Sequence, residues 1–148
     1  MSTHRIHRQV VEELYEETLL LADESRAVFD MRGREASGGG DPARIALSIE
    51  GLRTTTRLMN LLAWLLNQRA FIAGELSEGQ LRRCGALAQD RRSDPVQMDQ
   101  LELATRAMIR ESERLYARAE RLDLQLRTDI EGGSARELQE RLSSAFGG

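Results

Sequence analysis

The side chains best suited to chemistry lie along one polar face of the stretch 49–77. Steps of three and four residues, which keep side chains on one side of an α-helix, connect Arg53, Arg57, Asn60, Trp64, Asn67, Gln68, Phe71 and Glu75. Arginine and large aromatic residues ringed by polar groups are the composition of protein-binding hot spots. In an equally open interpretation, Trp64 and Phe71 turn sideways into a core, and the arginines are paired or extend along the surface. We take this face as a candidate protein-interaction site, formed by Arg53, Arg57, Asn60, Trp64, Gln68 and Phe71.

The arginines also allow an enzymatic hypothesis, an all-helical pocket that clamps a dicarboxylate as in the small helical chorismate mutases. The residues of suitable type are Arg53, Arg57, Gln68, Arg69 and Glu75. However, the pattern of those enzymes includes a lysine, and all 21 basic residues of this chain are arginine. We therefore expect a protein that is not an enzyme, and keep the arginine-lined pocket as the weaker alternative.

Other chemically useful residues are isolated. His4 and His7 are three residues apart, but no matching cysteine or carboxylate pair accompanies them as a zinc site requires. Cys84 is the single cysteine and has no histidine nearby in sequence, which is typical of a packing residue. No phosphate loop or dinucleotide fingerprint is present. We expect no metal and no cofactor.

Charge and hydropathy narrow the class of partner. The formal net charge of -3 gives no electrostatic reason to expect nucleic acid. A basic edge formed by Arg106, Arg110, Arg114 and Arg118 lacks interleaved aromatic residues, so we expect it to oppose an acidic helix. The longest apolar run, 61–66, is far shorter than the roughly 20 residues of a membrane span. With no signal peptide and one cysteine, these features predict a cytoplasmic protein.

Start and stop signals divide the chain into helices. The pattern predicts a first helix over about 5–30, followed by a glycine-rich linker at 31–41. Asp41-Pro42 and Asp94-Pro95 each combine an N-cap with proline at the first helical position, and so predict long helices over 42–73 and 95–130. Between these two long helices, Ser77 and Gln80 form a capping box that opens a short helix through Leu81 and Cys84.

Heptad patterns show which faces should pack. The first helix has a seam of Val11, Leu14, Thr18, Leu21, Ser25 and Val28, and the third has Met98, Leu101, Thr105, Met108, Ser112, Leu115, Ala119, Leu122 and Leu126. The central helix has two apolar stripes, so we expect it to lie between two neighbours. One stripe comprises Ile45, Ile49, Leu52, Thr56, Met59, Ala63, Leu66 and Ala70, and the other Leu58, Leu62, Leu65 and Ile72.

Arg69 falls within the second stripe of the central helix. An unpaired buried charge costs several kcal/mol, so we expect Arg69 to pair with a carboxylate of the first helix. The candidates are Glu13, Glu16 and Glu17.

These elements predict an all-α fold, an antiparallel bundle of three long helices with a short connecting helix and a flexible C-terminal tail. The bundle domain spans 1–132 and the tail 133–148. Leu138, Leu142 and Phe146 recur every four residues in the tail. Because so short a helix is marginal in water, the tail is expected either to fold on a partner, through these three side chains, or simply to fray.

The central stretch IEGLRTTTRLMNLLAWLLNQRAFIAGELS resembles the RcdA family of alphaproteobacteria, named for regulation of CtrA degradation. Its densest parts are RTTTRLM, WLLNQRA and GELS, and the later IRESERLYARAERLD resembles the same family's third helix. The resemblance covers most of residues 8–127.

The resemblance implies a non-enzymatic adaptor, a dimeric three-helix bundle that helps the ClpXP protease choose cell-cycle regulators as substrates. It implies protein partners of three kinds: a protease unfoldase, a receiver-domain adaptor and cargo regulators. The family has no catalytic residues to transfer to this sequence. A structural, self-associating bundle with no link to a protease remains the alternative.

Overall fold

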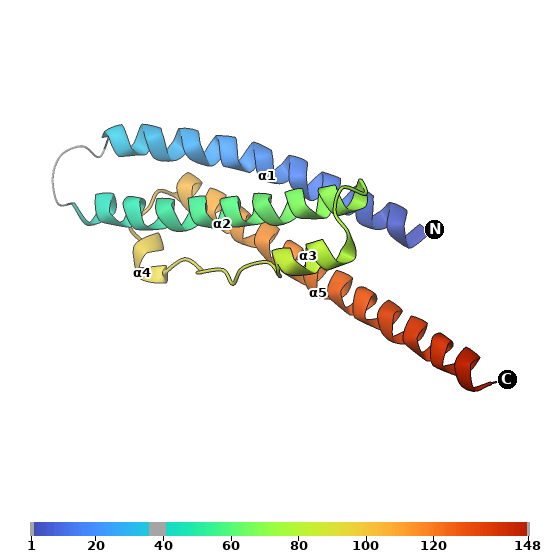
Figure 1. Cartoon of the computed structure of the whole chain (residues 1–148). Helices are drawn as coiled ribbons and strands as arrows, with labels where there is room; N and C mark the ends of the chain where they lie inside the picture. The colour runs from blue at the N-terminus through green and yellow to red at the C-terminus, as the bar shows by residue number, and fades with distance from the viewer. Residues whose placement is uncertain (1, 36–40, 148) are drawn as a thin grey trace.

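The computed structural model describes residues 2–35 and 41–147, and within them the chain is all-α. Its helices are α1 (Ser2–Glu35), α2 (Pro42–Ile72), α3 (Glu78–Cys84), α4 (Pro95–Met98) and α5 (Leu103–Phe146). The long helices α1 and α2 run side by side in opposite directions (Figure 1). Helix α5 crosses both, while α3 and α4 lie along α2 on the side away from α1 (Figure 1). The predicted fold class is confirmed.

The capping signals in the sequence act as predicted. The carboxylates of Asp41 and Asp94 accept hydrogen bonds from the second backbone N–H after each of them, at the starts of α2 and α4. Ser77 and Gln80 form the reciprocal capping box that opens α3. Gly74, directly after the C-cap residue Ala73 of α2, has a φ of 79°, a left-handed conformation that glycine adopts without a steric penalty.

Close packing joins α1 to α2. A side chain at Gly51 would place its Cβ 3.2 Å from the ring of Phe29, so glycine lets the two helices approach here. Near the other end of the pair, Arg69 Nε donates to Glu12 Oε1 at 2.8 Å, and its guanidinium lies 4.2 Å from the ring centre of Tyr15. The predicted ion pair with the first helix therefore forms, but with Glu12 rather than its acidic neighbours, and Arg69 is half-exposed rather than buried.

The core lies where α1, α2 and α5 meet. The predicted seams of α1 and α5 face it, with α4 and the following turn adding Met98 and Leu101. Its buried apolar members are Val11, Leu14, Leu21, Ala46, Leu58, Leu61, Trp64, Leu65, Met98, Leu101, Met108, Ile109, Leu115, Tyr116, Ala119 and Leu122. Deleting a fully buried leucine such as Leu61 typically costs about 2–5 kcal/mol of folding free energy, so these contacts hold the bundle together.

Several predicted boundaries are wrong. Helix α1 continues to Glu35, so the proposed linker begins later than Met31, and its residues 36–40 lie outside the described part of the chain. The third long helix does not begin at Pro95, because the short α4 ends at Met98 and α5 starts at Leu103.

The packing role predicted for Cys84 is also wrong, because its side chain is exposed at the end of α3.

The C-terminal tail also differs from its prediction. Gly132 and Gly133 lie inside α5, which continues to Phe146 and extends beyond the other helices (Figure 1). A glycine costs a helix about 1 kcal/mol relative to alanine without breaking it, and extending an existing helix avoids the cost of a new nucleus. The tail is therefore a helical continuation of α5 rather than a separate segment.

One stripe of α2 lacks the neighbour predicted for it within the described chain. Its large members are exposed: Ile45 by 52%, Leu52 by 70%, Met59 by 65% and Leu66 by 48%. Both long neighbours contact the opposite side of α2, where Leu58, Leu61 and Leu65 are buried. With three long helices, α2 has partners around only part of its circumference, and this stripe faces outward.

Replacing Gly132 and Gly133 with alanine should strengthen the C-terminal part of α5. Neither position has other atoms near the site of a new Cβ, so the change acts through helix propensity, by about 1 kcal/mol at each position. Backbone hydrogen exchange should slow over 133–146 and stay unchanged over α2. If exchange over 133–146 is as fast as in an unfolded peptide in the unsubstituted chain and in the variant, the continuous helix is contradicted.

Candidate interaction surface

The segment 85–94, which we call the tethered loop, connects α3 to α4 and is held by side chains of α2 and α5. From α2, Arg57 binds Asp90 and the carbonyl of Arg91, and Glu50 Oε1 accepts from the backbone N–H of Asp94 at 3.2 Å. From α5, the side chains of Glu113, Tyr116 and Asp123 bind the loop directly, and the hydroxyl of Ser112 accepts from Arg57. A segment without regular structure thereby gains partners for its polar groups.

Arg57 is the centre of these contacts and is only 1% exposed. Its Nε lies 2.9 Å from both carboxylate oxygens of Asp90, one terminal nitrogen donates to the Ser112 hydroxyl at 2.9 Å, and the other donates to the Arg91 carbonyl at 2.9 Å. A buried guanidinium requires a counter-ion and acceptors for its donors, and this site supplies both. Arg57 therefore joins α2, α5 and the tethered loop.

Trp64 and Asp123 make a second link between the same elements. The indole Nε1 of Trp64 donates to Asp123 Oδ1 at 3.2 Å, and the backbone N–H of Leu87 donates to Oδ2 at 3.3 Å. Arg127, one turn along α5, lies 3.2 Å from the same carboxylate. The buried tryptophan thus has an acceptor for its only polar hydrogen.

Tyr116 holds the middle of the tethered loop, because its hydroxyl donates to the carbonyl of Ala88. Burial, followed by the nearby charge of Asp90, raises the pKa of Tyr116 from 10.0 to about 12. The phenol is therefore neutral, and able to donate, throughout the ordinary pH range.

The predicted interaction face on α2 is divided between the interior and the surface. Arg57, Trp64 and Gln68 are buried, and of these three Gln68 also lines a groove at the end of the bundle. Arg53, paired with Glu50 at 2.8 Å, and Asn60 stay half-exposed. These positions agree with the interpretation in which Trp64 enters the core and the arginines are paired. The predicted residues do not form one continuous exposed face.

The residues predicted for an arginine-lined pocket come together only in part: Arg69 and Glu75 line one open groove with Arg8 and Glu12, while Arg53 and Arg57 lie elsewhere. Arg53, Arg57 and Arg69 each pair with a carboxylate of the same chain: Glu50, Asp90 and Glu12 respectively. A dicarboxylate ligand would have to compete with these internal ion pairs.

One extended apolar surface is the outward stripe of α2, which we call the α2 seam. It comprises Ile45, Ile49, Leu52, Thr56, Met59, Ala63, Leu66 and Ala70. The seam carries no charged side chain, and at 1.5 Å per residue it runs for roughly 38 Å. A long uncharged apolar surface of this kind marks an interaction site.

The second apolar surface is on the extension of α5. Leu138, Leu142 and Phe146 are all exposed and share one face of the helix, as their four-residue spacing predicted. Near its root, a groove between α1, α2 and α5 is lined in part by His7, Phe71, Leu126, Ile130 and Glu137. Phe71 therefore faces a surface groove at the end of the bundle, unlike the buried Trp64.

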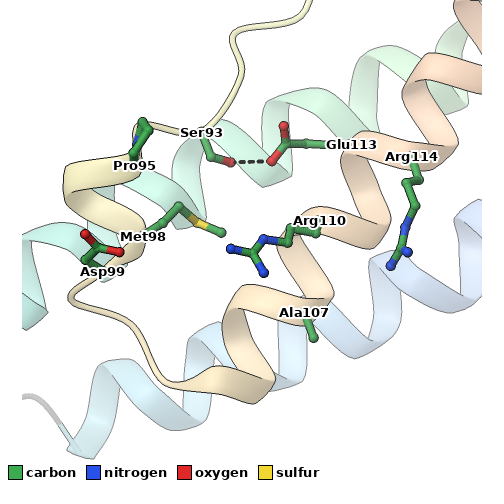
Figure 2. A pocket seen from close by; sticks show the side chains of 8 residues that line it. All are labelled: Ser93, Pro95, Met98, Asp99, Ala107, Arg110, Glu113 and Arg114. Atoms are coloured by element: carbon green, nitrogen blue, oxygen red, sulfur yellow. Dashed lines mark hydrogen bonds between the residues drawn. The ribbon is translucent and has the colours of Figure 1, made fainter.

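A smaller groove lies between α4 and the first half of α5 (Figure 2). Arg110 points into it toward Met98, and Ser93 donates to Glu113 at 2.7 Å along its edge (Figure 2). Asp99 and Arg114 complete its charged lining. Two acidic and two basic side chains balance here, so the groove has no net charge that would favour an anionic ligand.

Sequence reasoning missed Glu50, Tyr116 and Asp123 as anchors of the tethered loop, and Asp90 as the counter-ion that the loop supplies to Arg57. Their partners lie 28 to 59 positions away in the chain, beyond any helical period. The available signal was indirect: if Trp64 turns into the core and Arg57 is paired, as one of the two interpretations held, each requires an acceptor or a counter-ion from elsewhere.

Within residues 2–35 and 41–147, no helix is both long enough and apolar enough to cross a membrane. In the same part of the chain, no group of three or more His, Cys, Asp or Glu side chains is arranged to hold a metal ion.

The helices and their exposed apolar faces define an all-α bundle protein. Comparisons with known proteins then identify its family. A family model described as "Protein of unknown function (DUF1465)" matches residues 2–146. The crystal structure of RcdA from Caulobacter crescentus CB15 is similar with a TM-score of 0.59 and 32% sequence identity, covering 78% of this chain and 90% of that chain. The chain therefore belongs to this RcdA-like family. No curated protein matches the chain.

Substituting Arg57 with methionine should lower the free energy of unfolding by about 3 kcal/mol, because Asp90 would keep its charge in a largely buried place without a counter-ion. Urea denaturation followed by circular dichroism measures the change. The matched control is Arg114→Met, which breaks an exposed pair with Glu111 on α5 and should cost less than about 0.5 kcal/mol. Equal losses in the two variants would contradict the anchoring role of Arg57.

Stability should fall between pH 10 and 12 because of Tyr116. The folded chain holds the neutral phenol to a pKa of about 12, whereas the unfolded chain ionises near 10.0, so the contribution is complete below pH 10 and is lost as the pH rises toward 12. Denaturation at several pH values should show a weaker decline for Tyr116→Phe than for the unsubstituted chain. Identical slopes would mean that Tyr116 has the same pKa in both states.

Proposed function

We propose that this chain is a non-enzymatic adaptor that helps deliver cell-cycle regulators to the ClpXP protease. Its partners in this role are the protease unfoldase, a receiver-domain adaptor and the cargo, and it works in the cytoplasm as a homodimer. The observation that carries the proposal is the 32% identity to RcdA over 90% of that chain.

The geometry supports binding over catalysis. The α2 seam and the Leu138, Leu142 and Phe146 face are exposed apolar surfaces, each large enough to receive a partner. Arg53, Asn60 and Phe71 add half-exposed polar and aromatic groups on another edge of α2. Separate surfaces allow one small protein to hold two partners at once, which is what an adaptor requires.

A self-associating bundle without a protease link is the alternative that the same α2 seam supports. Such a protein would assemble with itself but leave the proteolysis of cargo unchanged. A degradation assay therefore distinguishes the two functions, whereas an assembly assay does not.

The test uses purified ClpXP, a receiver-domain adaptor and CtrA as the probe cargo. Adding the full chain should speed CtrA degradation. Replacing Leu138, Leu142 and Phe146 together with alanine should reduce that effect roughly tenfold, the equivalent of about 1.4 kcal/mol of lost binding. The matched control replaces Arg136, Glu140 and Ser144, which have the same spacing on another face of the tail, and should keep the full effect.

Two results would count against this assignment. Unchanged degradation on addition of the full chain contradicts the adaptor function and favours the alternative. Equal losses in the apolar and polar triple variants contradict the role given to the apolar face of the tail.

A further inference from the structure

Gln68 of α2 is buried, with 7% of its surface exposed, yet its side-chain amide has no hydrogen-bond partner in the described part of the chain. Its neighbours on α2 are paired: Trp64 donates to Asp123, and Arg69 donates to Glu12. An amide offers two donors and an acceptor oxygen, and leaving them unused in a buried place costs free energy. Gln68 can therefore bind a group that the described chain does not supply.

The amide of Gln68 faces two adjoining hollows at the end of the bundle. The larger lies between α1, α2, α5 and the start of α3, and has a volume of about 760 Å³, within the range typical of ligand sites. The smaller lies between α2, α3 and α5. Both hollows are lined by Gln68, Glu78, Leu126 and Ile130, so they meet around these residues. We call the combined hollow the Gln68 groove.

The floor of the Gln68 groove is apolar. Val11 of α1 is fully buried beneath it, and Ile72 of α2 is half-buried. From α5, Leu126 and Ile130 are also half-buried and line both hollows. The amide of Gln68 is thus a polar group set within an apolar floor, an arrangement that fixes the orientation of a ligand.

The rim of the Gln68 groove is acidic. Glu78 of α3 and two residues of α5, Asp129 and Glu137, line the larger hollow and are exposed. Arg8 of α1 opposes them, and His7 lies 4.0 Å from Asp129. Because the larger hollow has three lining carboxylates and one lining arginine among the described residues, its rim favours a cationic group.

The length of the groove suits an extended chain. The α5 residues that line the larger hollow run from Leu126 to Glu137, which at 1.5 Å per residue is about 16 Å. An extended peptide rises about 3.3 Å per residue, so about five residues span this distance. Successive side chains of such a peptide point to opposite sides, one toward the floor and the next toward the rim.

We infer that the Gln68 groove binds an extended peptide segment of a partner protein, in which an apolar side chain is flanked by basic ones. The apolar side chain packs on the floor, and one backbone amide pairs its N–H and C=O with the amide of Gln68. The basic side chains meet Glu78 at one end and Asp129 or Glu137 at the other. Glu137 also lies 3.6 Å from the exposed Arg141, a contact weak enough for a bound cation to replace.

An anionic ligand fits the groove less well. In the smaller hollow, two arginines are matched by two carboxylates: Arg82, Arg127, Glu78 and Asp123. Arg127 already pairs with Asp123 at 3.2 Å. The smaller hollow therefore has no excess positive charge for a phosphate or a dicarboxylate, and the rim of the larger one repels them.

Gly133 gives the groove a site where it can be blocked. It lines the larger hollow, and a Cβ added there meets no atom within 4 Å. A Cβ at the adjacent Gly132 also meets no atom, but Gly132 does not line the hollow. Since successive side chains of a helix point about 100° apart, leucine at 133 should occupy the groove while leucine at 132 should not.

The test titrates the peptide acetyl-Ala-Arg-Leu-Arg-Ala-amide into the full chain labelled with ¹⁵N. The side-chain amide resonances of Gln68 should shift and saturate, with a dissociation constant below about 1 mM. The control peptide, with both arginines replaced by glutamate, should bind at least roughly tenfold more weakly because of the acidic rim. Absence of shifts with the arginine peptide at millimolar concentration, or equal binding of the two peptides, would overturn the inference.

Gln68→Met tests the amide, because methionine keeps the size of the side chain and removes its polar groups. Binding of the arginine peptide should weaken roughly tenfold. The stability of the chain in urea should not fall, since the amide has no partner within the described chain. Unchanged peptide binding in this variant would overturn the pairing with Gln68, and a large loss of stability would show that the amide serves the fold instead.

Gly133→Leu and Gly132→Leu are a matched pair that tests the position of the peptide. Both substitutions raise helix propensity at exposed neighbouring sites, but only the first should weaken binding, by roughly tenfold or more. Equal binding by the two variants would overturn the groove as the site. The inference goes beyond the adaptor function proposed above and does not depend on it, because peptide binding is measured without ClpXP or CtrA.

Discussion

The burial of the Arg57 guanidinium is the constraint on which the arrangement of the other elements depends. A cation in this position is tolerated only because Asp90, Ser112 and a backbone carbonyl all converge on it. Two of these three partners belong to the tethered loop, whose residues lie in no helix. The charge on α2 thus fixes where the loop lies, and the loop in turn leads to the short α4, which packs against α2.

Helix α2 is central to the fold because its different sides make different contacts. One arc packs against α1 at Gly51, and the next contacts α5 and the tethered loop through Trp64 and Arg57. The remaining arc is the α2 seam. Because the core closes without the seam, the fold can be complete in one copy while an apolar surface stays available for association.

Ion pairs at the edges complement this core. Arg118 with Glu17 links α5 to α1 at 3.0 Å, and Arg32 with Glu102 links α1 to the start of α5. Exposed pairs of this kind contribute little stability each, typically below about 1 kcal/mol. Their value here lies in setting which helix faces meet. The basic edge expected to oppose the acidic first helix does so at Arg118, which pairs with Glu17, whereas Arg114 pairs with Glu111 of its own helix and Arg110 points into the groove beside α4.

Residues close together in the chain were enough to establish the all-α class, the caps at Asp41, Ser77 and Asp94, and the inward seams of α1 and α5. These features follow from local backbone chemistry and from the 3.6-residue period. The RTTTRLM and WLLNQRA segments also carried the family resemblance. In contrast, which α2 stripe faces outward depends on how many helices surround it. The burial of Arg57 and Trp64 depends on Asp90 and Asp123. These two residues are distant in the sequence and come close only in the folded chain. Periodicity identifies an apolar face but does not say what covers it, and a charged residue on such a face is placed by partners that the local sequence does not contain.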